Sequence, residues 1–419
     1  MRWHMAAATA VRNLWLSAAG VSFPPVMGRA GMVGVSDMAD KIVFTRRAVI
    51  AGGVAALAAG SQAHGAEEKP LADIVASFDR EREQRHVPSI SVALVEEGRV
   101  SLVARGHRNA ARGDPASPAT PYQAASISKT VAAMTAIALA ASGKISLDAD
   151  VTNYLKRWKL PQLPAKSSRP VTLRRLFGMT AGANVPGYLG YDVGAKLPTD
   201  IQILEGAPPA NSAAVRIITP PGTVRAYSGG GCQIAEVAIE DAVGQSFDDL
   251  AARLILRPLG MTGSGFFQPP DKAQRASFAL AHDDAGLAIA GGWHVYPEYA
   301  AAGLWSTPSD LAKIIRAMIA AQKEGAKTLF GADGLAARLT SVDDLGYGIG
   351  VALKGDGAQR IAMKRGNNLG FRSGLVACPA SGQGAVVMTN GNGGEPLVDA
   401  VLDALAERYR WPARAPWPE

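Results

Sequence analysis

Ser126 and Lys129 are the residues best suited to chemistry, and they stand three positions apart at the head of a long apolar run. On a helix this spacing places both side chains one turn apart on the same face. A serine hydroxyl is a weak nucleophile until a neighbour takes its proton, and a desolvated lysine can help to do so. The free N–H groups of a helix's first turn would tolerate an oxyanion. The pair therefore indicates nucleophilic catalysis; the alternative is that Ser126 caps a helix and Lys129 is solvated.

The run that follows decides where this pair would lie. Residues 131–140 are almost wholly apolar, so we expect a helix that continues to about Ala141 and is closed by Gly143. A helix that is apolar on all sides belongs in the protein interior. Ser126 is then expected where a buried helix meets a cleft. The pattern Ser-x-x-Lys occurs once in the chain.

Two further elements could complete a site. Tyr227 lies in a glycine-rich turn just before an expected helix, and nearby lysines could lower its phenol pKa until it acts as a base. Lys364 and Gly366 lie where one expected strand ends and another begins. Lys364 would place a cation on an edge strand, and Gly366 would let a substrate backbone lie close to that strand. The alternatives are a tyrosine that packs the turn and a charged strand end that guards a sheet edge.

Together these elements, in this order, resemble the serine β-lactamase and penicillin-binding-protein superfamily, in particular its class C-like hydrolases and esterases. The resemblance covers about residues 69–412. Its three motifs are Ser126-Ile-Ser-Lys129, Tyr227-Ser-Gly229 and Lys364-Arg-Gly366, with supporting stretches at 173–182, 258–262 and 302–310. The fold that it implies is α+β, an antiparallel sheet with flanking helices and an inserted, mainly helical domain.

The resemblance implies acyl transfer through a covalent intermediate. Ser126 would attack a carbonyl, while Lys129 and Tyr227 share the proton relay and Lys364 tunes the tyrosine. The backbone N–H groups of Ser126 and Asn367 would hold the oxyanion. Water would then release the acyl group, and no cofactor or metal is implied.

Two positions depart from the family pattern. Gly229 replaces an asparagine that bonds the substrate amide, and Arg365 replaces a small threonine that meets a substrate carboxylate. Arg365 could still bind a carboxylate or could narrow the site. Asn368 and Arg372 are further candidate anion contacts, with surface strand residues as the alternative. These departures favour an esterase or a peptidase-like hydrolase over an efficient β-lactamase.

Charge and composition exclude other classes. The net charge is +7 over 419 residues, but residues 1–66 hold six basic and two acidic residues, which leaves +3 for the remainder. That remainder has no Lys/Arg block, so we expect no nucleic-acid partner. Cys232, Cys378 and the six histidines stand in no metal-ligand spacing, so we expect no metal. We expect the cysteines to be two buried free thiols, with a disulfide between them in an oxidising compartment as the alternative. No Gly-x-Ser-x-Gly elbow is present, which argues against an α/β-hydrolase.

Residues 1–66 read as a leader. Arg46 and Arg47 precede a short Ala/Gly-rich run, and 44–66 resembles a twin-arginine export signal with a small-x-small cleavage pattern. An Ala-rich helix is the alternative. The run is too short and weakly apolar for a comfortable membrane span, and we expect none in the mature chain. Export predicts a periplasmic or secreted protein.

The pattern of elements predicts the domains. A hairpin over 89–105 opens the mature chain, helices and long loops fill 145–340, and strands return at 347–353, 360–364, 371–378 and 385–390 before a closing helix over 395–410. We therefore expect a sheet domain from 67–130 and 340–419 and an inserted helical domain at 131–339. The function that follows is an exported serine hydrolase of a small-molecule or peptide-like acyl substrate: an ester, a β-lactam or a D-amino-acid amide. The alternative is a non-catalytic or weakly catalytic binding protein on this fold, and the oligomeric state is left open.

Overall fold

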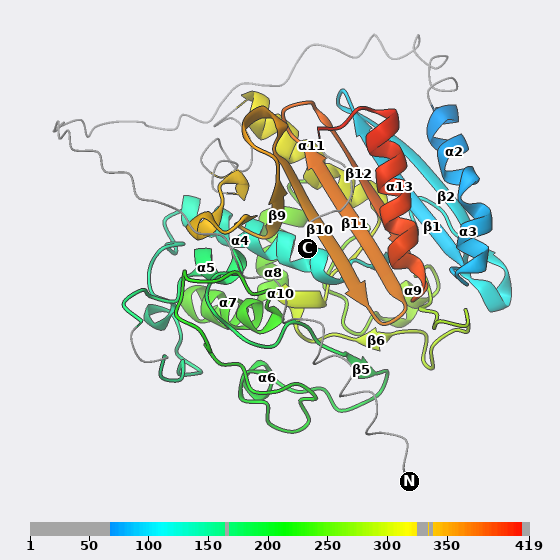
Figure 1. The fold of residues 1–419 in the computed structure, drawn as a ribbon. Helices are drawn as coiled ribbons and strands as arrows, with labels where there is room; N and C mark the ends of the chain where they lie inside the picture. The colour runs from blue at the N-terminus through cyan, green and yellow to red at the C-terminus, as the bar shows by residue number, and fades with distance from the viewer. Residues whose placement is uncertain (1–67, 164–166, 325–333, 335–337, 413–419) are drawn as a thin grey trace, which may run out of the picture. The chain divides into compact units, whose positions relative to one another are not determined.

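Strands from both ends of the chain build one antiparallel sheet, as the sequence predicts (Figure 1). The computed structural model describes residues 68–163, 167–324, 334 and 338–412. The predicted leader at 1–66, with its export signal at 44–66, lies outside the described residues.

The largest sheet in the described part of the chain has eight strands in the order β3-β2-β1-β12-β11-β10-β9-β8. These strands are β1 (Ser89–Glu96), β2 (Arg99–Asn109), β3 (Asp114–Pro115), β8 (Tyr347–Gly348), β9 (Val351–Lys354), β10 (Ile361–Asn368), β11 (Phe371–Cys378) and β12 (Gln383–Thr389). The predicted hairpin is confirmed as β1 and β2, with Ser89 opposite Gly106. On its other side β1 pairs with β12, where Ile90 lies opposite Thr389. This pairing joins the two ends of the chain and fixes the fold class as α+β.

The C-terminal strands differ from the prediction in two places. The single strand expected over 347–353 is two strands, β8 and β9, because the chain turns at Gly350 with φ 79°. A Cβ at Gly350 would stand 2.5 Å from the Cβ of Ala133, so only glycine lets this turn press against the helix that follows Ser126. β10 runs to Asn368 rather than 364, and motif three therefore lies within a strand.

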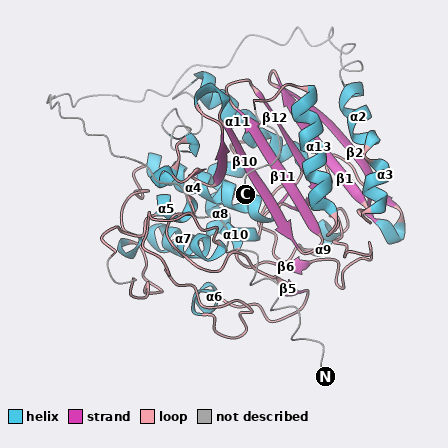
Figure 2. Cartoon of the chain, in the orientation of Figure 1, coloured by secondary structure: helices cyan, strands magenta, loops and turns pink. Residues whose placement is uncertain are grey.

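Helices cover both faces of the sheet (Figure 2). Those described are α2 (Glu68–Ser77), α3 (Asp79–Gln84), α4 (Ser128–Ala141), α5 (Leu173–Phe177), α6 (Asp200–Glu205), α7 (Gly229–Val243), α8 (Phe247–Ala251), α9 (Lys272–Arg275), α10 (Tyr299–Ala302), α11 (Pro308–Glu324) and α13 (Gly394–Arg408). α13 crosses the near face in Figure 1 and packs on β11 and β12, while α11 packs on β1 and β12 from the other side. Alternate residues of β1 enter two cores, Val92 with the α2 and α13 cluster and Ala93 with the other. A sheet buried on both faces explains why β1 reads as one continuous apolar run.

The apolar segment after Ser126 forms the interior helix that the sequence predicts. α4 begins at Ser128, and every residue from 128 to 137 is buried. The helix contacts α5, α7, α8 and α10, so no face of it meets solvent over these residues. Gly143, with φ 71°, follows its end. The division into a sheet domain and an inserted helical domain stays a prediction.

The cysteines and the lengths of the helices bear on two further expectations from the sequence. Cys232 on α7 and Cys378 on β11 are buried free thiols, as expected. Across the described ranges, no helix combines the length and apolar character needed to cross a bilayer.

Candidate active site

Ser126 lies in a short 3₁₀ turn, η3 (Ala125–Ile127), directly before α4. Across residues 121–137, all of them described, Ser126 is the one position that is not buried. Ala125 has φ 51°, a left-handed conformation that is uncommon for a residue with a Cβ. Such conformations cost free energy and persist only where the surroundings hold them. The turn thus exposes one hydroxyl in an otherwise buried segment.

Hydrogen bonds from distant parts of the chain hold this turn. The Ala124 N–H donates to the Leu304 carbonyl at 2.8 Å, and Ser373 Oγ on β11 donates to the Ala124 carbonyl at 3.0 Å. Ser128 Oγ accepts from the Leu304 N–H at 2.9 Å. β10 approaches so closely that a Cβ at Gly366 would stand 2.2 Å from the Ala124 carbonyl oxygen. Gly366 is therefore required for strand and turn to pack together.

Lys129 points at the serine. Its Nζ lies 2.9 Å from Ser126 Oγ and 2.7 Å from the carbonyl oxygen of Ala301 on α10. The side chain is buried, with 1% of the residue exposed. Ser126 makes no helix-capping hydrogen bond, since Ala124 and Ile127 occupy the N-cap positions of η3 and α4. The alternative of a capping serine beside a solvated lysine is therefore wrong.

Tyr227 and Lys364 join the pair from two other elements. Lys364 Nζ on β10 donates to the Tyr227 hydroxyl at 3.0 Å, and the Nζ atoms of Lys364 and Lys129 lie 4.5 and 5.1 Å from the centre of the tyrosine ring. Tyr227 directly precedes Ser228, the N-cap of α7. Residues separated by more than 230 positions in the sequence thus meet around one hydroxyl.

The electrostatics suit Tyr227 as a base. Burial by itself raises the pKa of its phenol. The positive charges of Lys129 and Lys364 act against burial, as do hydrogen bonds from Ser126 and Lys364, and together they lower the phenol pKa to about 8. Burial also lowers the pKa of Lys364, against the opposite pull of Tyr227. Ser126 Oγ, between an ammonium donor and a phenol, is placed to lose its proton to Tyr227.

Arg365 does not line the site, so its predicted role as a substrate contact is wrong. Successive residues of a strand point to opposite faces, and Lys364 takes the face toward Tyr227. Arg365 takes the other face and pairs with two residues of α13: its guanidinium lies 3.1 Å from Glu395 Oε1 and 2.7 Å from Asp399 Oδ2. It ties the sheet to α13.

This placement predicts the effect of Arg365→Gln. We expect kcat/KM for a small ester to stay within about twofold, and the free energy of unfolding to fall by about 1 kcal/mol, since the ion pairs are only partly buried. Denaturant unfolding and initial rates measure the two effects. The matched control is Lys364→Met, one position away on the other face, which we expect to lose activity. A rate loss in Arg365→Gln equal to that of the control would contradict the placement.

Asn368 and Arg372 are also structural rather than anion contacts. The Asn368 amide is buried and donates to Gln123 Oε1 at 2.8 Å and to the Ala302 carbonyl at 3.3 Å. Arg372 donates to the Asn368 carbonyl at 2.6 Å and thereby ties the turn between β10 and β11. Asn367 is exposed. It lies on the part of β10 that continues beyond Met363, and Met363 is the last β10 residue that pairs with β9. β10 also packs against η3, and the oxyanion role of the Asn367 N–H stays a prediction.

Some of the residues that hold the site carry no signal in the sequence. The Ala301 carbonyl that positions Lys129 is a backbone group, which any residue type could supply. Ser373, which holds the turn by a hydrogen bond, is one of several serines in strands. The sequence signal nearest to Ala301 is the stretch at 302–310, which supports the family resemblance.

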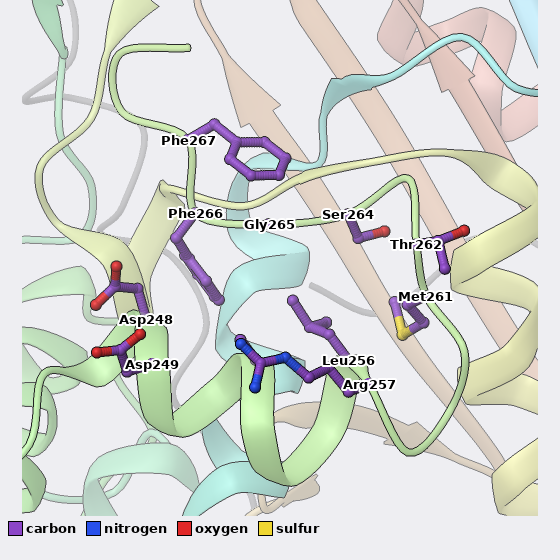
Figure 3. Close-up of a pocket in the computed structure, with 11 residues that line it drawn as sticks. Asp248, Asp249, Leu256, Arg257, Met261, Thr262, Ser264, Gly265, Phe266 and Phe267 are labelled. Atoms are coloured by element: carbon purple, nitrogen blue, oxygen red, sulfur yellow. The ribbon is translucent and has the colours of Figure 1, made fainter. Parts of the chain in front are cut away.

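A cavity elsewhere does not belong to this site. About 280 Å³ in volume, it lies beside α8 and the π-helical turn Ala252–Leu256, and Figure 3 shows Asp248, Asp249, Arg257 and Phe266 around it. None of the predicted site residues lines it. The site is therefore defined by side-chain geometry around Ser126.

Comparison with known sequences identifies the family. The sequence model of the family described as Beta-lactamase matches residues 71–409. Protein flp of Staphylococcus aureus (strain N315) is 25% identical over 244 residues, which cover 55% of this chain and 44% of that protein. Penicillin-binding protein 4 of Amycolatopsis lactamdurans is 27% identical over 205 residues, 49% of this chain and 51% of that protein. The chain thus spans about half the length of the curated relatives that it matches.

Solved structures share the fold. The octameric penicillin-binding protein homologue from Pyrococcus abyssi superimposes with a TM-score of 0.65 at 24% identity, over 81% of this chain and 77% of that one. SurE with D-Leu gives a TM-score of 0.63 at 22% identity, over 82% and 76%. At these identities the likeness concerns the fold alone.

Proposed function

The chain belongs to the serine β-lactamase and penicillin-binding-protein superfamily, and we propose that it is an exported serine hydrolase that works through a covalent acyl-enzyme. The observation that carries the proposal is Ser126 Oγ, the accessible hydroxyl of a buried segment, 2.9 Å from the Nζ of a buried lysine. The proposal of export rests on Arg46 and Arg47 ahead of the Ala/Gly-rich run.

The proposed mechanism assigns each residue a step. Ser126 Oγ accepts a hydrogen bond from Lys129 and gives its proton to the Tyr227 phenolate as it attacks the substrate carbonyl. The C–O bond to the enzyme forms, and the oxyanion takes hydrogen bonds from the N–H groups of Ser126 and Asn367. Tyr227 then passes the proton to the leaving group as its bond to the acyl carbon breaks. Water attacks the acyl-enzyme by the same route and restores Ser126.

The substrate is an acyl compound: an ester, a β-lactam or a D-amino-acid amide. Turnover of a nitrophenyl ester, a chromogenic cephalosporin and a D-alanyl amide by the purified protein separates the three. We expect the ester to be the best of them, because Gly229 offers no side-chain amide to bind a substrate amide.

Covalent labelling tests the proposal. A fluorophosphonate probe should add one mass increment to the native protein, and peptide mapping should locate it on Ser126. Heat-denatured protein and Ser126→Ala should stay unlabelled, because reaction requires both the hydroxyl and the folded relay. If the native protein takes up no probe, the binding-protein alternative replaces the hydrolase.

A further inference from the structure

The loop of residues 184–190 fills the space that Gly229 leaves empty. A Cβ built on Gly229 would stand 3.1 Å from Cε2 and 3.4 Å from Cδ2 of Tyr188. Such distances are tight van der Waals contacts, so the tyrosine ring lies directly against the point from which a motif-two side chain would project. The sequence showed that a side chain is missing here, and the structure shows an aromatic ring beside the gap.

We propose that Tyr188 is a specificity-determining residue: its ring forms an apolar wall beside the nucleophile and selects substrates with an apolar acyl group over those with an amide on the acyl side. This inference rests on the proposed function, because it concerns the choice of acyl group by the same acyl-enzyme.

Tyr188 is held in place at both ends of its loop. The N–H groups of Gly229 and Gly230 donate to the carbonyls of Pro186 and Val185 at 3.1 and 2.9 Å. These bonds tie the loop to the start of α7, two residues after Tyr227. Val185 has φ 57°, which is a genuine outlier for a β-branched residue and marks a segment held by its surroundings.

The other end of the loop is tied to the end of β10. The Tyr296 hydroxyl donates to the Leu189 carbonyl at 3.3 Å and accepts from the Leu369 N–H at 3.0 Å. Leu369 follows Asn368, the last residue of β10. Tyr188 therefore stands between motif two and the end of the strand that carries motif three, and both motifs border Ser126.

The ring, and not the hydroxyl, faces outward. The Tyr188 side chain is half-buried, yet its hydroxyl is fully covered and has no hydrogen-bond partner among the described residues. Burial, aided by the nearby Glu298, Cys232 and Glu236, raises the pKa of this phenol well above its usual value. The polar end of the side chain is thus directed into the protein, and a substrate meets ring carbons.

Apolar surface continues from the ring. The neighbouring Leu189 is 73% exposed. Tyr188, Leu189, Val185 and Pro186 line a cavity of about 280 Å³ together with the polar residues Asn184, Asn211 and Ser212. This volume is close to the lower end of small-molecule sites. An acyl chain packed against the Tyr188 ring and Leu189 would lose contact with water, whereas an amide placed against the ring carbons would lose its hydrogen bonds to water.

The test compares acyl groups in the full-length protein. The measured quantity is the ratio of kcat/KM for p-nitrophenyl butyrate to that for p-nitrophenyl acetate, in wild type, Tyr188→Ala and Tyr188→Phe. We expect Tyr188→Ala to lower the ratio about tenfold, the scale of lost apolar contacts in a pocket, because the longer acyl chain loses more contact than acetate does. Tyr188→Phe keeps the ring and should keep the ratio.

A second comparison needs no variant at the loop. Wild-type protein should be labelled faster by an alkyl fluorophosphonate than by one of equal length with an amide beside the phosphorus. An unchanged ester ratio in active Tyr188→Ala, an equal loss in Tyr188→Phe, or faster labelling by the amide probe would each overturn the role of Tyr188. A wild-type protein that neither reacts with the probes nor hydrolyses the esters would instead overturn the proposed function, and this inference with it.

Discussion

Lys129→Met is expected to lower kcat/KM for ester hydrolysis by about 10²–10⁴-fold, the range for loss of a positioned proton-transfer group. Lys129 Nζ is 2.9 Å from Ser126 Oγ, and its charge is the largest of the effects that lower the phenol pKa of Tyr227. The substitution therefore removes a hydrogen bond to the nucleophile and at the same time makes the base less able to exist as phenolate. Steady-state rates and the rate of fluorophosphonate labelling measure the loss.

Control measurements separate this effect from misfolding. Methionine has a length and volume close to those of lysine, so the buried space stays filled, although the Ala301 carbonyl loses its donor. Circular dichroism and thermal unfolding should show a folded protein. A folded Lys129→Met variant with wild-type labelling rates would refute the role of Lys129 in the relay.

Tyr227→Phe is the second substitution with a large expected effect, again about 10²–10⁴-fold on kcat/KM. Because the phenol pKa is about 8, activity of the wild type should rise with pH as the phenolate forms, with a midpoint near that value. In Tyr227→Phe this rise should disappear along with most of the rate. A pH profile of kcat/KM for both proteins measures both expectations.

Lys364→Met tests whether the charge of Lys364 lowers the phenol pKa of Tyr227. The charge of Lys364 favours the phenolate, so removing it should raise the phenol pKa and move the rise in activity to higher pH. Arg365→Gln removes a charge one position away that faces α13 and should leave the midpoint unchanged. A midpoint that stays at the wild-type value in Lys364→Met would show that another group controls the profile.

Ser126 and Lys129 could be predicted from the residues alone because their signal is local. Ser126 and Lys129 are one helical turn apart, and the apolar run behind them required an interior helix, which α4 is. Tyr227 and Lys364 were found through motifs of a known family, with no physical signal that joined them to Ser126. The structure brings them together, with Lys364 Nζ 3.0 Å from the tyrosine hydroxyl.

The direction of each side chain was not predictable in the same way. Arg365 follows Lys364 in the sequence and was expected to meet substrate, but the alternation of a strand turns it toward Glu395 and Asp399 on α13. The prediction failed because β10 runs to Asn368, four residues beyond the strand expected from the sequence, so that the motif obeys strand geometry. The Asn368 amide likewise donates its hydrogen bond to Gln123, which lies 245 positions away in the sequence.

What the sequence by itself indicated is the candidate nucleophile Ser126 with Lys129 beside it, the interior helix behind them and the order of strands and helices, because residue type, short spacing and apolar periodicity are properties of neighbouring residues. What only the tertiary structure decided is which groups surround that nucleophile. The Ala301 carbonyl, the close approach of Gly366 to η3 and the ring of Tyr188 beside Gly229 all arise from contacts between distant segments. Such contacts depend on the packing of the whole fold, and no local pattern encodes them.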